Sequence, residues 1–305
     1  MEIFYRDTDI TEIVTTRKCI VRDTAGGRCD SLELEFENAA GWYSWGPEED
    51  DKIIVTHSGY SSGTMYVNSI IPENGRFRLI ATSLPCAARA KGYKAYYKKT
   101  IEHIMRDCAN TSGMDFRVFG IDGAEEIPYI ERDNEGCAAF LNKLLTLESA
   151  VLKCINGRYT AIGISYAQDL PAAQTMELFA NQASSRYKRA GAACRSLTVQ
   201  TPYAKGAAED TAVKNSHMSL TDCRLPVMND IQAARWARGK LLSINRECES
   251  LEVQGDFSPG MSAMMRIDID GDTDATGEWV VELAEHDLIA MKTAISLRRC
   301  VRTIR

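Results

Sequence analysis

The hexapeptide CDSLEL at residues 29–34 returns as CESLEV at residues 248–253. In both stretches apolar side chains alternate with polar ones, which predicts a strand with one buried face. Each continues through a Gly/Pro-containing turn, an apolar strand and a Ser- or Asp-rich turn. A glycine and a further apolar strand follow, GTMYV at residues 63–67 and GEWVV at residues 277–281. The sequence therefore predicts two copies of one β-rich unit in a single chain.

The periodicity of the apolar residues divides the chain into three expected domains, at residues 1–86, 87–164 and 165–305. The first and last are predicted to be the two β-barrel units, closing on strands near Phe77–Thr82 and Thr293–Leu297. The last also carries a helical insert at about 206–247. The expected class is α+β, mainly β, with a small α+β domain between the two units.

Three helices are predicted from apolar residues that recur at i, i+3, i+4 and i+7. They cover residues 98–110, about 135–147 and about 229–246. Asn134 or Asp133 is the expected N-cap of the second helix. Leu197–Gln200 is interpreted as a possible strand of the second barrel, and the remainder of 165–215 carries little pattern.

Composition excludes several classes of protein. The 305 residues are 45% hydrophobic and 26% charged, with a formal net charge of −6, which argues against a dedicated nucleic-acid binder. No apolar run reaches the roughly 20 residues of a membrane span, and the N-terminus lacks the pattern of a secretory signal. The ten cysteines show no CxxC pair, so they are expected to be reduced thiols packed as small hydrophobes.

No catalytic constellation emerges from the motifs. GYSSG at residues 59–63 matches the nucleophile elbow of hydrolases, but strand-like sequence on both sides favours a hairpin turn. The acidic run at residues 268–274 has Thr273 where a calcium loop needs glycine, which favours an acidic turn. The four histidines share no spacing typical of a metal site. No catalytic residue, cofactor or metal is therefore predicted.

The tryptophans are the strongest candidates for contacts with partner proteins, unless they are buried in the core. Trp236 and Trp279 lie on periodic apolar faces and are expected in the core. Trp42, Tyr43 and Trp45 lie in a polar, turn-rich segment, where core and interface roles are equally compatible with the sequence. These three are the candidate interface residues.

The order and spacing of several segments resemble the phage late control protein D family. The first domain contributes DSLEL at 30–34, WGPEEDDKI at 45–53, GTMYV at 63–67 and ATS at 81–83. Further on, the resemblance rests on IPYIERDNE at 127–135 followed by Phe140-Leu141, AARWAR at 233–238, and EWVV at 278–281 followed by His286-Asp287-Leu288. Arg132 and Gly136 depart from the family pattern, which often has Gln and Ser there.

The resemblance implies the hub of a contractile-tail baseplate, or tail tip, in a phage or a headless tail-like bacteriocin. Such a hub has two tail-tube-like β-barrels per chain and forms a homotrimeric, pseudo-sixfold ring that adapts a hexameric tail tube to a trimeric spike. The implied partners are the tail tube or tube-initiator protein, the central spike protein, the tape-measure protein and other baseplate proteins. The implied location is the baseplate of the virion or tail-like particle, assembled in the bacterial host cytoplasm.

The internal duplication leads to the same expectation. Each chain has two similar units, so three chains together present six similar faces. DNA is expected only as cargo passing through the lumen, where an acidic surface would discourage sticking. Two alternatives stay open from the sequence. One is a tail-associated cell-wall hydrolase, and the other is a carbohydrate-binding module that uses Trp42, Tyr43 and Trp45.

Overall fold

The computed structural model describes residues 1–37, 45–73, 75–179, 185–189, 193–214, 218–271 and 273–305. The first sheet unit is built where apolar and polar residues alternate, and its core contains the buried Leu32, Leu34 and Phe36. Its strands are β1 (Glu2–Tyr5), β2 (Thr8–Asp9), β3 (Thr16–Thr24), β4 (Ser31–Phe36), β5 (Lys52–His57), β6 (Tyr60–Ser61), β7 (Met65–Glu73) and β8 (Arg76–Thr82).

The second sheet unit has a core of its own around the fully buried Trp279, which confirms the prediction for that residue. Its strands come from the last half of the chain. They are β14 (Gln174–Leu178), β15 (Ser185–Arg189), β19 (Glu249–Asp256), β20 (Arg266–Gly271), β21 (Gly277–Asp287) and β22 (Lys292–Arg299).

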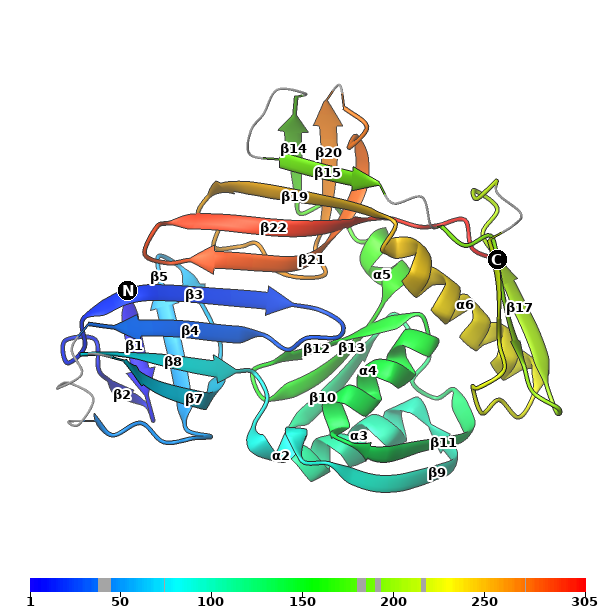
Figure 1. Ribbon diagram of the computed structural model, residues 1–305, viewed down its shortest axis with the longest axis horizontal. Helices are drawn as coiled ribbons and strands as arrows, with labels where there is room; N and C mark the ends of the chain where they lie inside the picture. Colours follow the sequence, from blue (N-terminus) through cyan, green and yellow to red (C-terminus); the bar gives the residue numbers. More distant parts are fainter. Residues whose placement is uncertain (38–44, 74, 180–184, 190–192, 215–217, 272) are drawn as a thin grey trace.

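The two units share one sheet, in which neighbouring strands follow the order β15–β19–β22–β21–β3–β4–β8–β7–β5–β1–β2 (Figure 1). Strand β20 pairs with β21, and β14 pairs with β20. The units therefore lie side by side and are joined edge to edge by β21 and β3. No sheet closes on itself as a barrel within the part of the chain that the structure describes.

The predicted duplication extends to individual residue pairs. Strand β4 pairs with β8 as β19 pairs with β22, so Ser31 faces Thr82 in one unit and Ser250 faces Arg298 in the other. The strand orders β3–β4–β8–β7–β5 and β15–β19–β22–β21–β20 correspond one to one. The two units are thus structural repeats with the same register.

A bulge appears at the same place in both repeats. The pairing of β7 with β8 shifts by one residue between Val67 and Ser69, and that of β21 with β22 shifts between Val281 and Leu283. A bulge bends a strand and increases its twist. The shared bulge gives both units the same local bend.

The middle part confirms the predicted α+β arrangement. Its elements are α2 (Cys86–Arg89), β9 (Gly92–Thr100), α3 (Ile101–Ser112), β10 (Asp115–Phe119), β11 (Glu126–Glu135), α4 (Cys137–Leu147), β12 (Ala150–Ile155), β13 (Arg158–Gly163) and α5 (Ile164–Asp169). Thr100 is the N-cap of helix α3, and its Oγ1 accepts a hydrogen bond from the backbone N–H of His103 at 3.2 Å.

The predicted cap of α4 was wrong. Strand β11 pairs with β9 as far as Glu135, so Asn134 and Asp133 lie inside a strand. The residue before the helix is Gly136, which makes no side-chain cap. The pairing of β11 with β9 thus outweighs the local preference of Asn134 and Asp133 for a helix N-cap.

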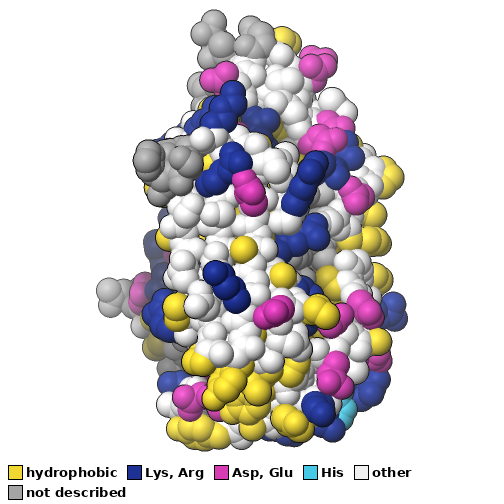
Figure 2. All heavy atoms as spheres, turned by 90° about the vertical axis from the view of Figure 1, so that its right-hand side faces the viewer, with side chains coloured by type: hydrophobic (Ala, Val, Ile, Leu, Met, Phe, Trp, Pro, Cys, Tyr) yellow, Lys and Arg dark blue, Asp and Glu magenta, His cyan; other side chains and the backbone are white. Residues whose placement is uncertain are grey.

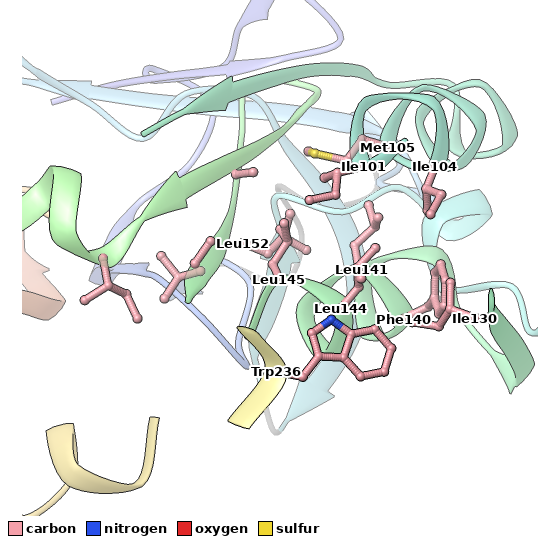
Figure 3. Close-up of a cluster of buried hydrophobic side chains, with 14 of the residues drawn as sticks. Ile101, Ile104, Met105, Ile130, Phe140, Leu141, Leu144, Leu145, Leu152 and Trp236 are labelled. Carbon is pink, nitrogen blue, oxygen red and sulfur yellow. The ribbon is translucent and has the colours of Figure 1, made fainter. Parts of the chain in front are cut away.

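Helix α6 (Asp230–Arg246) confirms the predicted helix, and Asn229 caps it by accepting from the backbone N–H of Gln232 at 2.8 Å. Its Trp236 is fully buried and lies beside Phe140 and Leu144 of α4, as Figure 3 shows. The indole Nε1–H donates to Glu148 Oε1 at 2.7 Å. The helical insert therefore completes the core of the middle part.

A separate small sheet covers the other side of α6. It has the order β17–β16–β18, with β16 (Ser196–Gln200), β17 (Lys205–Glu209) and β18 (Ser219–Asp222). The strand predicted at Leu197–Gln200 exists but belongs to this sheet and not to the second unit. The reason is that Leu197 and Val199 are buried in the same core as Trp236.

The fold class is as predicted, α+β and mainly β, with an intervening α+β part and a helical insert. Within the described ranges, no helix is long and apolar enough to cross a membrane.

Candidate assembly surface

The seam between the two units is an antiparallel pairing of β21 with β3. It runs from Leu283 opposite Thr24 to Asp287 opposite Ile20. Backbone hydrogen bonds continue it at both ends, from the N–H of Ala25 to Glu282 O at 3.1 Å and from the N–H of Leu288 to Cys19 O at 2.9 Å. We call this pairing the seam.

One face of the shared sheet carries charged side chains on both sides of the seam. Residues of this face alternate with core residues along each strand, and those on β3 and β21 lie directly opposite one another. The charged face contains basic and acidic side chains in nearly equal number: Lys18, Arg22, Glu33, Glu35, Arg76, Arg78, Arg186, Lys188, Glu252, Asp256, Glu282, Glu285, Asp287, Lys292 and Arg298.

Ion pairs connect this face. Arg22 Nε donates to Glu285 Oε2 across the seam at 2.7 Å, and Lys18 Nζ donates to Glu33 Oε1 at 2.7 Å. Partial burial alone would raise the pKa of Glu33, but hydrogen bonds from Lys18 and Arg22 lower it below its ordinary value. The face is held by paired charges and is not an acidic surface.

The charged face is also hollowed over the second unit. An open hollow of about 600 Å³ is lined by Arg28, Arg186, Lys188 and Arg298 together with the carboxylates of Glu252 and Glu282. A second hollow of about 300 Å³ continues past Glu285 and Ser296. Concavity and paired charge distinguish this face from the core side of the sheet.

Beneath the seam, a buried charge cluster joins three parts of the chain. Lys153 of β12 forms an ion pair with Asp23 of β3 and lies 4.0 Å from Asp30. Ser262 Oγ donates to the other oxygen of Asp23 at 2.6 Å. Burial raises the pKa of Asp30, while the ammonium of Lys153 opposes that rise. The cluster fixes the first unit, the second unit and the middle part relative to one another.

His286 lies in the seam itself and is fully buried. Its Nε2 contacts Met261 O and its Nδ1 contacts Thr293 Oγ1, both at 3.1 Å. Because a carbonyl only accepts, Nε2 carries the proton and Nδ1 accepts from the hydroxyl. Burial lowers the pKa of this ring, so it is a neutral structural residue.

The sequence did not single out these residues. A signal for Lys153 exists, since it is the one charge in the otherwise apolar VLKCI at residues 151–155. Arg22 and Glu285 carry no local signal, because they lie 263 positions apart.

Of the predicted interface residues, Trp42 and Tyr43 lie outside the described residues. Trp45 is half-buried and packs against the first core, with its ring centroid 4.8 Å from that of Tyr5 and 5.8 Å from that of Phe77. An interface role for these three residues stays a prediction.

The GYSSG motif turns tightly from β5 into the two-residue strand β6, which pairs antiparallel with β5, as the hairpin interpretation predicted. Ser62 is buried, accepts from the backbone N–H of Val55 at 3.0 Å and donates to Gly63 O at 2.9 Å. Its hydroxyl holds the hairpin together.

A different surface lies beside the small sheet. Figure 2 shows mixed charges over this side of the molecule and hydrophobic side chains gathered towards its lower end. Exposed apolar side chains at the start of α6 and in the turn before β17 include Tyr203, Met228 and Ile231.

Solved structures share this architecture. The chain is similar to the 43 kDa tail protein of prophage MuSo2 from Shewanella oneidensis, with a TM-score of 0.72 and 14% identity over 98% of this chain and 97% of that one. A tail protein from Neisseria meningitidis gives a TM-score of 0.75 and 10% identity, covering 98% of this chain and 96% of that one.

A third similarity is to an Escherichia coli component of the type VI secretion system that is itself similar to tail proteins gp27 and gp5 of bacteriophage T4. It has a TM-score of 0.56 and 11% identity over 94% of this chain and 74% of that one. No family model matches the chain. No curated protein matches it in sequence. The expected likeness to phage tail and baseplate proteins is therefore confirmed in three dimensions: this chain has the fold of the phage tail proteins.

Proposed function

We propose that the chain is a non-enzymatic structural protein of a phage tail or tail-like particle, and that it forms the hub of the baseplate. The observation that carries this proposal is the seam, which joins two repeats of one sheet unit edge to edge. Three such chains around an axis would place six repeats in a ring. A ring of this kind matches a hexameric tube on one side and a trimeric spike on the other.

In this arrangement the hollowed, charged face lines the lumen. Several of its carboxylates form ion pairs with Lys or Arg, and basic and acidic side chains are nearly equal in number, so the channel wall carries no large acidic surplus. This revises the expectation of an acidic conduit. Carboxylates interspersed among the basic side chains oppose binding of the phosphates of passing DNA, which serves the same purpose.

The experiment that tests the proposal is the mass of the purified chain across a concentration series, followed by electron microscopy of the largest species. Three copies around one axis, with six similar sheet units in the ring, are the expected result. A closed assembly with any other number of copies would contradict it.

A second measurement addresses the enzyme alternative. The purified chain is expected to leave a cell-wall zymogram uncleared, because the hydroxyl of Ser62 is committed to backbone partners. Clearing that is lost in a Ser61→Ala or Ser62→Ala variant would replace the structural role with a hydrolytic one.

A further inference from the structure

Two strand edges of the shared sheet carry no strand partner among the described residues. Strand β15 pairs with β19 on one side only, which leaves the other edge of Arg186–Arg189 open. Strand β7 pairs with β5 only at its start, through Met65 and Tyr66. Its second half, Ser69–Glu73, pairs with β8 alone.

These two edges are the counterparts of the strands that form the seam. Strand β15 lies beside β19 as β3 lies beside β4, so Lys188 faces Ser250 where Arg22 faces Ser31. In both β7 and β21 a bulge is followed by a second half of the strand, and these two halves correspond residue by residue. Glu73 therefore corresponds to Asp287. Each chain thus contains one seam, between β21 and β3. Strand β15 and the second half of β7 are the counterparts of these two strands, and they are not paired with each other.

We propose that β15 of one copy pairs antiparallel with the second half of β7 in the next copy, in the register of the internal seam. Ile20 faces Asp287 within the chain, so Arg186 faces Glu73 between chains. The remaining pairs are Tyr187 with Pro72, Lys188 with Ile71 and Arg189 with Ile70. This inference rests on the proposed ring and names the contact that closes it.

Charge supports the pairing. The β15 sequence SRYKR carries three basic residues and no acid, and the opposing stretch of β7 carries the exposed carboxylate of Glu73. The backbone bonds at Cys19 and Ala25 make His286 and Val21 a hydrogen-bonded pair, so the neighbouring pair of Ile20 and Asp287 is not hydrogen-bonded. Arg186 and Glu73 inherit this geometry, in which opposing side chains come closest.

Pro72 fits the same scheme. It occupies the place of His286, whose backbone N–H points across the seam, so the missing N–H of Pro72 lies on the open edge of β7. Proline and basic side chains on open edges discourage pairing with unrelated strands. The contact between copies therefore has one backbone hydrogen bond fewer than the internal seam.

The contact has to join two different molecules. Seven strand spacings separate β15 from β7 along the sheet, a path of about 34 Å, and Figure 1 draws the two strands well apart, with β15 near the top and β7 at the lower left. A disulfide requires Cα atoms within about 7 Å, so no cross-link between Arg186 and Glu73 forms inside one chain.

The test is a cysteine cross-link in a chain whose exposed Cys86 and Cys223 are replaced by serine. On oxidation, the variant Glu73→Cys with Arg186→Cys is expected to give a covalent series that ends at three copies. The matched control is Glu73→Cys with Lys188→Cys, on the same face but two residues out of register. It is expected to lose the cross-link.

The outcomes separate this register from the proposed function. A three-copy ring by mass that shows no Glu73–Arg186 cross-link, or equal cross-linking in the control, overturns the register and leaves the hub standing. A Glu73–Arg186 cross-link whose series runs beyond three keeps the register and overturns the three-copy ring. A chain that stays a single copy at every concentration, with no cross-link, overturns both.

A charge exchange gives an independent measurement. Arg186→Glu is expected to shift the mass distribution from three copies towards one, because like charges then face each other. Adding Glu73→Arg is expected to restore the ring, whereas Lys292→Glu, on the charged face away from the edges, leaves it intact. Equal effects of Arg186→Glu and Lys292→Glu would contradict the contact.

Discussion

The two sheet units share strand order, register and bulge, yet they differ at their edges. Strand β3 of the first unit is long and pairs with β21, whereas its counterpart β15 is short and basic and pairs with β19 alone among the described residues. The buried Phe36 and Phe77 of the first unit correspond to the exposed Gly255 and the buried Thr293 of the second. The comparison teaches that register and bulge define the repeat, while edges and core size are adapted to what each unit contacts.

The largest expected effect concerns the cluster that holds the two units together. Lys153→Met leaves Asp23 and Asp30 buried without their cation, so the free energy of unfolding should fall by about 3–5 kcal/mol. Denaturant unfolding measures this loss. Adding Asp23→Asn should recover part of it, and the exposed Lys292→Met should leave the midpoint unchanged. An unaltered midpoint for Lys153→Met would show that the cluster does not hold the units together.

The next effect exchanges a core residue between the units. Phe77 is fully buried with its ring centroid 4.7 Å from that of Phe36, whereas the second unit has Thr293 at this place. Phe77→Thr should destabilise the protein by about 3 kcal/mol, because it opens a cavity in the first core. Thermal and denaturant unfolding measure the change. Ile80→Thr, on the charged face of the same strand, should cost under about 1 kcal/mol; equal costs would contradict the assignment of faces.

A smaller effect distinguishes two corresponding glycines, Gly63 just before β7 and Gly277 at the first position of β21. Gly63 has φ of +67° and Gly277 has φ of +132°. At both positions an added methyl group meets one side chain that has to shift, Asn156 at Gly63 and Arg299 at Gly277. Alanine at Gly63 should cost about 1–2 kcal/mol, and at Gly277 about 2–3 kcal/mol, because the second conformation is nearly restricted to glycine. Gly255→Ala, with open space around the added methyl group, is the control and should cost nothing measurable. A larger cost at Gly63 than at Gly277 would reverse this ranking.

The smallest effect is on pH dependence. His286 in the second unit has a lowered pKa through burial, and Pro72 takes its place in the first. The unfolded chain then binds a proton on this ring more readily than the folded chain, so stability falls as the pH drops below about 6.5. Denaturant unfolding measured from pH 8 to pH 5 should show that the free energy of unfolding falls less for His286→Gln than for the unaltered protein. The exposed His103→Gln is the matched control, and an equally reduced fall in both variants would remove His286 as the cause.

Local pattern explains what the sequence could predict. Alternation in β4 and β19, the 3.6-residue period of α3, α4 and α6, and the repeated glycines indicated the elements and the duplication. Strands β14, β15, β17 and β18 were missed because few of their residues are large and apolar and the strands lack clear alternation, as in SRYKR. The seam and the Lys153 cluster could not be predicted, since they depend on contacts between distant parts of the chain.

The seam also has a consequence for synthesis of the protein. Arg22 and Glu285 are 263 positions apart, so β3 leaves the ribosome long before the strand that covers it. At roughly 5–20 residues per second, the edge of β3 waits about 13–50 s for β21. Arg17, Lys18 and Arg22 along β3 give that nascent edge positive charge, which lowers its tendency to pair with other newly made chains during this interval.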